Sequence, residues 1–415
     1  MTVSYNLNLS TSKPWAQFRL LLRWRGSIWK LVLTECLIFY FTYTIINIFC
    51  TFVLAPHTKE RLIEFIKWLN PSNKYSFFIP LEFMLGFFVT AILQRWSTAL
   101  NNLAFIDRIA VAIAGYIHGT SEKCRIIRRN IIRYMCLCEV LVFRDISLPV
   151  RKRFPTIDTI VAAGFMLPHE KEIFDSFETT YPKYWVPLQW ANLLVYKART
   201  ENLIISDIFC EQIFEEIRSF RANLGEVLKV DWVPLPLAYP QLIYLAVHVH
   251  FILSLISKQE LDAEWWFPKW IPLITLVQFF FYMAWTKVAM VLINPFGEDD
   301  DDFETNFLID RNIKIGILIV DEGYGVVPEQ KRDIFWGNRV DPLYSEESAK
   351  TTANQANTLV GSATGLTLPE NVSKILMMPL NNNDDDDELM EANKFTKRYS
   401  IVQIPRSVIS KLLIV

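Results

Sequence analysis

The sequence has no large excess of charge of either sign and no cysteine framework. Its 42 Lys and Arg and 44 Asp and Glu residues leave a formal net charge of -2, which argues against a protein organised around nucleic acid. Its six cysteines show no pairing pattern. Cys136 and Cys138 have no Cys or His partner at metal-ligand spacing, so we interpret them as small buried side chains rather than half of a metal site.

Signatures of catalysis and of secretion are also missing. The sequence contains no phosphate-binding loop, no nucleophile elbow and no helical His-Glu metal pattern, so an enzyme is disfavoured. His248 and His250 are two positions apart and cannot share a helical face. The first 27 residues lack a short apolar core with a small-residue cleavage site, so we expect no cleavable signal peptide and a cytosolic amino terminus.

Apolar residues are abundant instead. The hydrophobic content of 52%, the aromatic content of 14% and the mean hydropathy of +0.21 favour a membrane protein. A helix that crosses a bilayer needs roughly 20 mostly apolar residues. Four segments meet this requirement: Leu31 to Leu54, Tyr75 to Leu93, Val233 to Ile256 and Pro268 to Ile293. Shorter apolar runs between the second and third segments suit buried helices of a soluble domain.

The positive charges near the span ends predict the orientation of the chain. Lys and Arg residues cluster before the first span and after the second, whereas the connection from Lys258 to Glu264 is short and acidic. An even number of spans then places both termini in the cytosol. The predicted parts are a cytosolic amino-terminal segment (1–30), a transmembrane hairpin (31–93), a helical cytosolic domain (94–232), a second hairpin (233–293), a cytosolic segment (294–344) and a flexible cytosolic tail (345–415).

An acidic stretch with four consecutive aspartates, Ile293 to Glu304, follows the fourth span directly. Carboxylate and carbonyl oxygens are the ligands that Ca²⁺ selects, so the stretch is a candidate calcium site. A helix beginning after Asn294 and Pro295 would also favour acidic side chains in its first turn. Taken by itself, such a solvated acidic helix start is the commoner origin of an acidic run.

Several segments, in this order, are similar to those of the bestrophins, a family of calcium-activated anion channels. The segments are Trp24-Arg25-Gly26-Ser27, Ile79-Pro80, Phe83-Met84-Leu85-Gly86-Phe87, Arg95-Trp96, Lys152-Arg153-Phe154-Pro155, the discontinuous set Ala162, Gly164, Phe165 and Met166, Trp185-Val186-Pro187, Asp231-Trp232, and Ile293 to Asn306. The resemblance covers Met1 to about Tyr344. It implies an all-α membrane protein with four transmembrane helices and a large helical cytosolic region per subunit, assembled as a pentamer of identical subunits around one pore.

The resemblance assigns the pore lining to the second span. It implies a hydrophobic neck formed by Ile79, Phe83 and Phe87, and their spacing of four residues puts them on one helical face. Such a constriction can gate by dewetting, and ring edges carry partial positive charge that can face an anion. The resemblance also implies a second constriction, a cytosolic aperture, at Ile208. The sequence alone would assign Ile208 to a hydrophobic core. Glu82 departs from the family pattern, and its angular offset from Phe83 favours an adjacent helix over the pore.

For calcium, the resemblance implies ligands from the Asp299 and Asp302 side chains and from the main-chain carbonyls of Ser10, Val291 and Asn294. The glycine that an EF-hand loop requires at its sixth position is missing, so this would be a different kind of site. Ca²⁺ would be regulatory and would bias the neck between closed and open.

The function we expect is therefore a calcium-activated chloride channel of the plasma membrane, with bicarbonate as a possible second anion and no nucleic-acid partner. A calcium-binding regulatory or adaptor subunit with little conductance of its own is the alternative. In the tail, the segment Asn354 to Leu368 is expected to restrain opening, and phosphate on Ser362 would release it.

Overall fold

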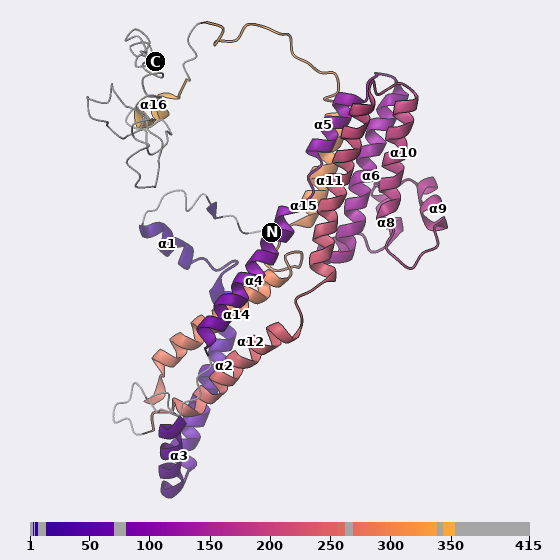
Figure 1. The fold of residues 1–415 in the computed structure, drawn as a ribbon. Helices are drawn as coiled ribbons and strands as arrows, with labels where there is room; N and C mark the ends of the chain where they lie inside the picture. Colours follow the sequence, from indigo (N-terminus) through magenta and orange to yellow (C-terminus); the bar gives the residue numbers. More distant parts are fainter. Residues whose placement is uncertain are drawn as a thin grey trace, which may run out of the picture. The chain divides into compact units, whose positions relative to one another are not determined.

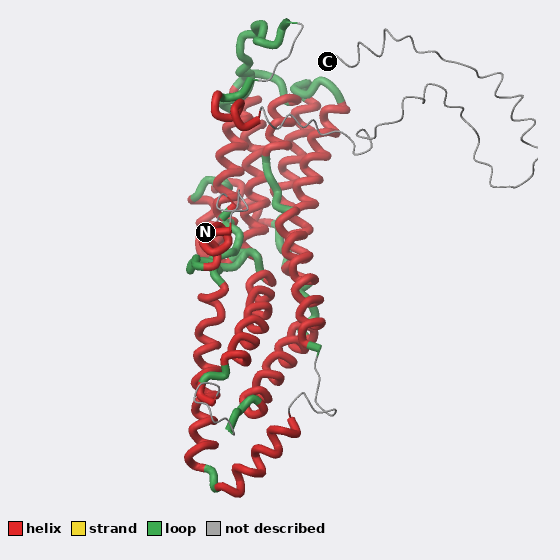
Figure 2. The backbone as a smooth tube through the Cα atoms, turned by 90° about the vertical axis from the view of Figure 1, so that its left-hand side faces the viewer, coloured by secondary structure: helices red, strands yellow, loops and turns green. Residues whose placement is uncertain are grey.

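The computed structural model describes residues 3, 5–6, 14–69, 80–261, 269–337 and 343–352, and every regular element in these ranges is a helix (Figures 1 and 2). The all-helical prediction is therefore confirmed. The chain divides into two compact units, Met1–Pro328 and Glu329–Val415. The described part of the second unit contains the short helix α16 (Glu346–Thr352), where an extended tail was expected, and an ion pair of 2.6 Å joins its Lys350 to Glu346.

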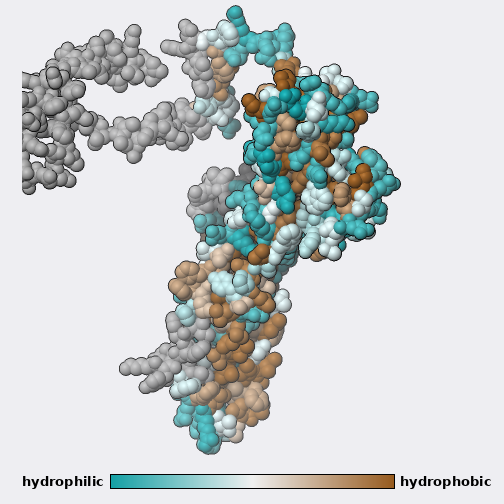
Figure 3. Space-filling model, turned by 45° about the vertical axis from the view of Figure 1, so that its right-hand side comes forward, coloured by the Kyte–Doolittle hydropathy of each residue, from teal (hydrophilic) through white to brown (hydrophobic). Residues whose placement is uncertain are grey.

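Four helices of the first unit are long and apolar enough to cross a membrane, and we call them the span bundle. They are α2 (Ile28–Ile48) with its π-helical extension η2 (Phe49–Val53), α4 (Leu81–Asn101), α12 (Ala238–Ser257) and α14 (Leu273–Ile293). Apolar residues dominate the visible surface over this bundle (Figure 3). Large side chains such as Leu37, Phe41 and Ile45 of α2 are exposed, which suits contact with lipid.

The span boundaries differ from the prediction mainly at prolines and at the end of α4. Helix α12 begins at Ala238 rather than Val233, because Pro234 and Pro236 have no backbone N–H to continue a helix. Helix α4 was expected to end at Leu93 but continues to Asn101, since its last turns pack with the other helical bundle of this unit, where Ala99 is fully buried. Helix α14 ends at Ile293, as predicted.

Aromatic contacts and an ion pair hold the span bundle together. Phe39 of α2 stacks on Phe279 of α14 at a centroid distance of 4.3 Å and meets the edge of Phe251 of α12 at 6.0 Å. Lys287 of α14 lies 2.5 Å from Glu35 of α2, so the two opposite charges found in separate spans are paired. The additional helices α1 (Pro14–Leu21) and α3 (Pro56–Leu69) flank α2 in the chain.

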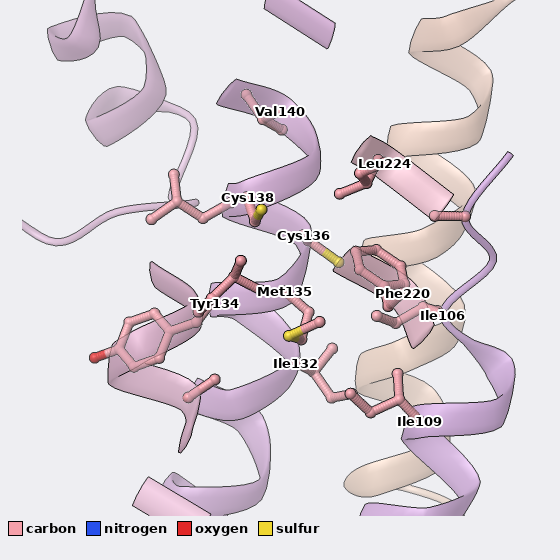
Figure 4. Close-up of a cluster of buried hydrophobic side chains, with 14 of the residues drawn as sticks. Ile106, Ile109, Ile132, Tyr134, Met135, Cys136, Cys138, Val140, Phe220 and Leu224 are labelled. Carbon is pink, nitrogen blue, oxygen red and sulfur yellow. The ribbon is translucent and has the colours of Figure 1, made fainter. Parts of the chain in front are cut away.

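The second group of helices in this unit, the large bundle, buries most of the hydrophobic core. Its main helices are α5 (Asp107–Tyr116), α6 (Glu122–Ile146), α10 (Trp185–Thr200), α11 (Asp207–Trp232) and α15 (Thr305–Val320), with the short helices α7 (Leu148–Arg153), α8 (Ile157–Ala162) and α9 (Pro168–Ser176). Side chains of Ile132, Met135 and Phe220 meet in this core (Figure 4). Cys136 and Cys138 are fully buried there, which confirms their interpretation as small core residues.

A buried polar contact ties α15 to α6. The amide Nδ2 of Asn312 donates to the two carboxylate oxygens of Glu139 at 3.0 and 3.1 Å and to the carbonyl oxygen of Ala104 at 2.8 Å. Glu139 and Asn312 are both fully buried. Burial raises the pKa of Glu139 to about 8, and the hydrogen bond from Asn312 opposes that rise. This contact fixes the helix that follows the acidic stretch.

Candidate pore face and acidic turn

The acidic stretch forms a turn that joins the two bundles. Helix α14 ends at Ile293 and α15 begins at Thr305, so the helix expected directly after Asn294 and Pro295 is absent, and that expectation was wrong. The reason lies in local hydrogen bonding. Phe296 N donates to the side-chain oxygen of Asn294 at 3.2 Å, which offers this backbone group an alternative to a helical partner. We call residues 294–304 the acidic turn.

Aromatic residues anchor the acidic turn in the large bundle. Phe296 is 2% exposed and meets the edge of Phe143 of α6 at a centroid distance of 5.8 Å. Phe303 packs against the same core, and its backbone N–H donates to the Pro295 carbonyl at 2.9 Å. Lys152 of α7 forms an ion pair with Glu298. The turn therefore cannot move without disturbing α6 and α7.

The turn, rather than a helix, brings together the two aspartates predicted to bind calcium. Asp302 Oδ2 accepts a hydrogen bond from Asp299 N at 2.7 Å, and Asp302 N donates to the Asp299 carbonyl at 3.2 Å. Asp302 is only 6% exposed. Burial raises its pKa to about 6, and the neighbouring negative charges of Asp299 and Asp301 add to the rise. A cation bound at this turn would favour the ionised form of Asp302 and so oppose this rise in pKa.

Two of the oxygens that the sequence predicts as calcium ligands border the space beside Gly297. A Cβ atom placed on Gly297 would lie 2.7 Å from Asp302 Oδ2 and 3.6 Å from both the carbonyl oxygen and the side-chain Nδ2 of Asn294, so an amide donor borders this space as well. The carbonyl of Val291 lacks a helical partner, because the residue four positions later is Pro295. Ser10 lies outside the described residues. Within the described ranges, no group of three or more His, Cys, Asp or Glu side chains could hold a metal.

Lys30 in the first turn of α2 and Gly26 just before that helix contact the acidic turn, and the sequence analysis predicted neither contact. Lys30 Nζ lies 2.5 Å from Asp300 Oδ2, and Gly26 N donates to the same oxygen at 3.4 Å. The bond from Lys30 holds the pKa of Asp300 below its usual range. Gly26 has a φ of +67°, and a Cβ there would lie 2.8 Å from Asp301 Oδ1. The Trp24-Arg25-Gly26-Ser27 segment therefore needs its glycine for this close approach.

One face of α4 is exposed within the part of the chain that the structure describes. Phe83 and Phe87 are 66% and 60% exposed, and their rings meet edge to face at a centroid distance of 4.6 Å. The opposite face of α4, with Leu85 and Phe88, is buried against α12 and α14. The structure thus places two of the predicted neck residues together on an exposed face. The third, Ile79, lies outside the described residues.

Glu82 and Ile208 both lie on exposed surfaces. The Tyr282 hydroxyl of α14 donates to Glu82 Oε1 at 2.9 Å, which confirms that this acid contacts an adjacent helix.

Ile208 lies in the first turn of α11 and is 69% exposed, so the assignment to a core that the sequence alone suggests was wrong. Ser206 caps the amino-terminal end of α11, because its hydroxyl accepts a hydrogen bond from Ile208 N at 3.2 Å. Ser362 lies outside the described residues.

A family model described as "Bestrophin, RFP-TM, chloride channel" matches residues 1–322 of the chain. The chain belongs to the bestrophin family. Among curated bestrophins of Caenorhabditis elegans, it is 48% identical to Bestrophin homolog 24 over 384 residues, which cover 91% of this chain and 60% of that protein. It is 43% identical to Bestrophin homolog 18, with 91% of this chain and 83% of that protein covered. The chain thus spans less than two thirds of the length of homolog 24.

Solved bestrophin structures share the fold. A mutant of a bacterial bestrophin homolog from Klebsiella pneumoniae is 17% identical and superimposes with a TM-score of 0.53, covering 70% of this chain and 99% of that one. The family resemblance seen in the sequence is therefore confirmed, as is the four-helix membrane architecture of this bestrophin. Two partners near its acidic turn and pore face, Lys30 and Tyr282, were not singled out from the sequence. A signal was available only for the charged one, because Lys30 before the first span and the acidic run after the fourth carry opposite charges on the same predicted side of the membrane.

Proposed function

We propose that this bestrophin is a subunit of a calcium-activated anion channel in the plasma membrane. In this proposal, five identical subunits surround one pore, chloride is the permeant ion with bicarbonate as a second anion, and both termini and the large bundle lie in the cytosol. The observation that carries the proposal is the exposed aromatic face of α4, where Phe83 and Phe87 are exposed within a helix that can span a membrane. An exposed aromatic pair in a membrane-spanning helix must face either lipid or a pore.

Helix α4 has the features that a pore-lining helix requires. Phe83 and Phe87 would form the neck together with Ile79, and an ion passing between such rings must shed water without replacement ligands. Ring edges carry partial positive charge, which lowers this barrier for anions. A Cβ placed on Gly86 would meet nothing within 4 Å in the single subunit, so a neighbouring α4 could approach closely.

The acidic turn would be the calcium site. Asp299 and Asp302 would bind through their side chains, and Ser10, Val291 and Asn294 through main-chain carbonyls. When bound, Ca²⁺ would supply positive charge that offsets the repulsion within the run of aspartates. The residues of the turn would transmit the effect of binding. Phe296 anchors the turn in the large bundle, and the turn is directly continuous with α14. A change in the turn would therefore reach α14, which packs on α4.

The exposed position of Ile208 supports its proposed role in the cytosolic aperture, since a constriction needs side chains that face open space. The parts 1–30, 31–93, 94–232, 233–293, 294–344 and 345–415 remain our proposed division of the chain. In the last part, the segment Asn354 to Leu368 would restrain opening until Ser362 is phosphorylated. Truncation after Tyr344 should then slow inactivation, and unchanged gating kinetics would exclude this restraint.

The test is the anion current of purified protein in a planar bilayer while calcium is titrated. We expect current that rises with calcium, and Asp302→Ala should lose most of that response. Direct calcium binding, measured by calorimetry on the same samples, should fall in parallel. Asp158→Ala is the matched control, because Asp158 is an exposed acid of α8 that pairs with Lys171 away from the turn.

Each outcome of this experiment has a distinct meaning. Calcium binding without any anion current would favour the regulatory or adaptor subunit over the channel. Anion current without calcium dependence would retain the pore and exclude the acidic turn as the sensor. A normal calcium response in Asp302→Ala would likewise exclude the acidic turn as the calcium sensor.

A further inference from the structure

Glu82 lies beside the neck residues but is held by a different helix. It occupies the first turn of α4, directly before Phe83, and its side chain is exposed in the single subunit. Its partner Tyr282 lies near the midpoint of the 21-residue helix α14, roughly 14 Å from the first residue of that helix. The amino-terminal end of α4 and Glu82 therefore lie beside the middle of α14, at the same level along the span bundle as the neighbouring Phe83.

A hydrogen bond keeps the Glu82 carboxylate against α14. The Tyr282 hydroxyl donates to Glu82 Oε1 at 2.9 Å. The Tyr282 ring is itself held by the span bundle, where it meets the edge of Phe251 at a centroid distance of 5.8 Å. The cation of the same helix, Lys287, is paired with Glu35 at 2.5 Å. Among the described residues, the phenol of Tyr282 is thus the side chain that bonds to Glu82.

The position of this carboxylate matters because charge in a narrow pore selects ions. Rings of acidic side chains attract cations and repel anions in channels. In the proposed assembly, five copies of Glu82 surround the neck, so a carboxylate that leaves α14 would add negative charge on the anion path. An acid in that place is opposed to anion conduction unless something withdraws it. The phenol of Tyr282, whose ring packs on Phe251, provides such a restraint.

We propose that Tyr282 is a positioning residue that holds Glu82 away from the pore axis and so preserves the preference of the neck for anions over cations. This inference rests on the proposed function, since it concerns the selectivity of the same pore. It assigns Glu82 a latent cation-selective role that is exposed only when the hydrogen bond is lost. The role belongs to a pair of residues on two helices rather than to the neck alone.

The test measures the permeability ratio of chloride to sodium from reversal potentials in purified channels. Tyr282→Phe removes only the hydroxyl, and we expect the ratio to fall by roughly fivefold as the carboxylate is released. Glu82→Gln combined with Tyr282→Phe should restore the original ratio, because the released group is then neutral. Glu82→Gln alone should leave the ratio unchanged. This rescue by a second substitution would not occur if Tyr282→Phe only weakened the fold.

Two further variants guard the interpretation. Glu82→Asp keeps the charge but is one methylene too short to reach the phenol, so it should lower the ratio even if Tyr282→Phe fails to assemble. Thr286→Val is the matched control, because the Thr286 hydroxyl bonds to the Tyr282 carbonyl and not to the acid. Its ratio should equal that of the unmodified channel.

Two results would overturn the inference. A conducting Tyr282→Phe or Glu82→Asp channel with an unchanged ratio would show that the hydrogen bond does not shape selectivity. A rise in the ratio for Glu82→Gln alone would show that the carboxylate already faces the pore. Failure of the proposed function looks different, since the unmodified protein would then carry no anion current under any calcium concentration.

Discussion

Lys30 and Asp300 are 270 positions apart in the chain, yet Lys30 Nζ lies 2.5 Å from Asp300 Oδ2. This ion pair connects the first turn of α2 to the acidic turn. Asp300 is also within 3.9 Å of Arg25, so the amino-terminal end of the first span carries two cations at the edge of the proposed calcium site. Their positive charge both holds the turn and competes with a bound cation.

This arrangement predicts opposite effects for the two partners. Lys30→Met should lower the calcium concentration for half-maximal current by about twofold, because it removes a positive charge near the site. Asp300→Asn should raise it by a similar factor. The melting temperature should hardly change, since solvent screens ion pairs this exposed and they contribute little to stability. Calcium titrations at two salt concentrations check the prediction, and an increase for both variants would indicate positioning rather than charge.

The space beside Gly297 predicts that a single methyl group impairs calcium binding. In Gly297→Ala, the new Cβ would lie 2.7 Å from Asp302 Oδ2, so the carboxylate must leave its hydrogen bond to Asp299 N. We expect at least about tenfold weaker calcium binding by calorimetry, equivalent to about 1.4 kcal/mol. Gly115→Ala is the matched control, because a Cβ on that glycine of α5 meets nothing within 4 Å. Normal affinity in Gly297→Ala would exclude this space as part of the site.

The aromatic face of α4 predicts that removing one of its rings allows anion current in the absence of calcium. Phe87→Ala should produce anion current without calcium, because a wider and less apolar neck stays hydrated. Phe41→Ala serves as the control, since Phe41 is equally exposed, at 60%, but lies on α2. Current recorded in calcium chelator checks the prediction. If both variants behave like the unmodified channel, the neck does not lie at Phe87.

The exposed Ile208 predicts an effect on the choice among anions. Ile208→Ala should change the relative permeability of chloride and larger anions, because it widens the proposed aperture in the cytosol. The calcium dependence should stay the same, since Ile208 belongs to α11 and not to the acidic turn. Ile205→Ala, at a neighbouring exposed position, tests whether the effect is specific. Identical anion selectivity in the unmodified and Ile208→Ala channels would remove Ile208 from the permeation path.

The buried Glu139 predicts a pH dependence of stability. Its folded pKa of about 8 lies above the unfolded value of 4.5, so the folded state binds the extra proton between these values. Stability should therefore fall as pH rises through this window, by at most about 1.4 kcal/mol per pH unit. Glu139→Gln should flatten this dependence and raise the melting temperature above pH 8. Melting curves of both proteins from pH 5 to 9 test this, and parallel curves would contradict it.

The spans illustrate what patterns within one segment can predict. Long apolar runs require burial in lipid or protein, so their number and approximate limits follow from composition alone. The end of α14 at Ile293 was predicted because an acidic run follows immediately. The start of α12 was misplaced by a few residues, since Pro234 and Pro236 break the helix within a continuous apolar pattern. The end of α4 was missed because its last turns are stabilised by the large bundle.

The acidic turn and Ile208 show where local patterns fail. The charge run itself was visible, but its backbone was expected to be helical. The observed turn depends on the Asn294 side chain and on Phe296 packing against Phe143, which is far away in the sequence. Ile208 has the composition of a core residue, and only the packing of α11 leaves it exposed.

The sequence by itself determined that this is a four-span helical membrane protein of the bestrophin family, because hydrophobic burial and specific motifs are properties of continuous segments. Only the tertiary structure decided which side chains meet. The pairs Lys30 with Asp300 and Tyr282 with Glu82 join segments at least 200 positions apart. Hydrogen bonds and ion pairs act over a few ångströms, so such pairings depend on how helices pack and leave little trace in the local sequence.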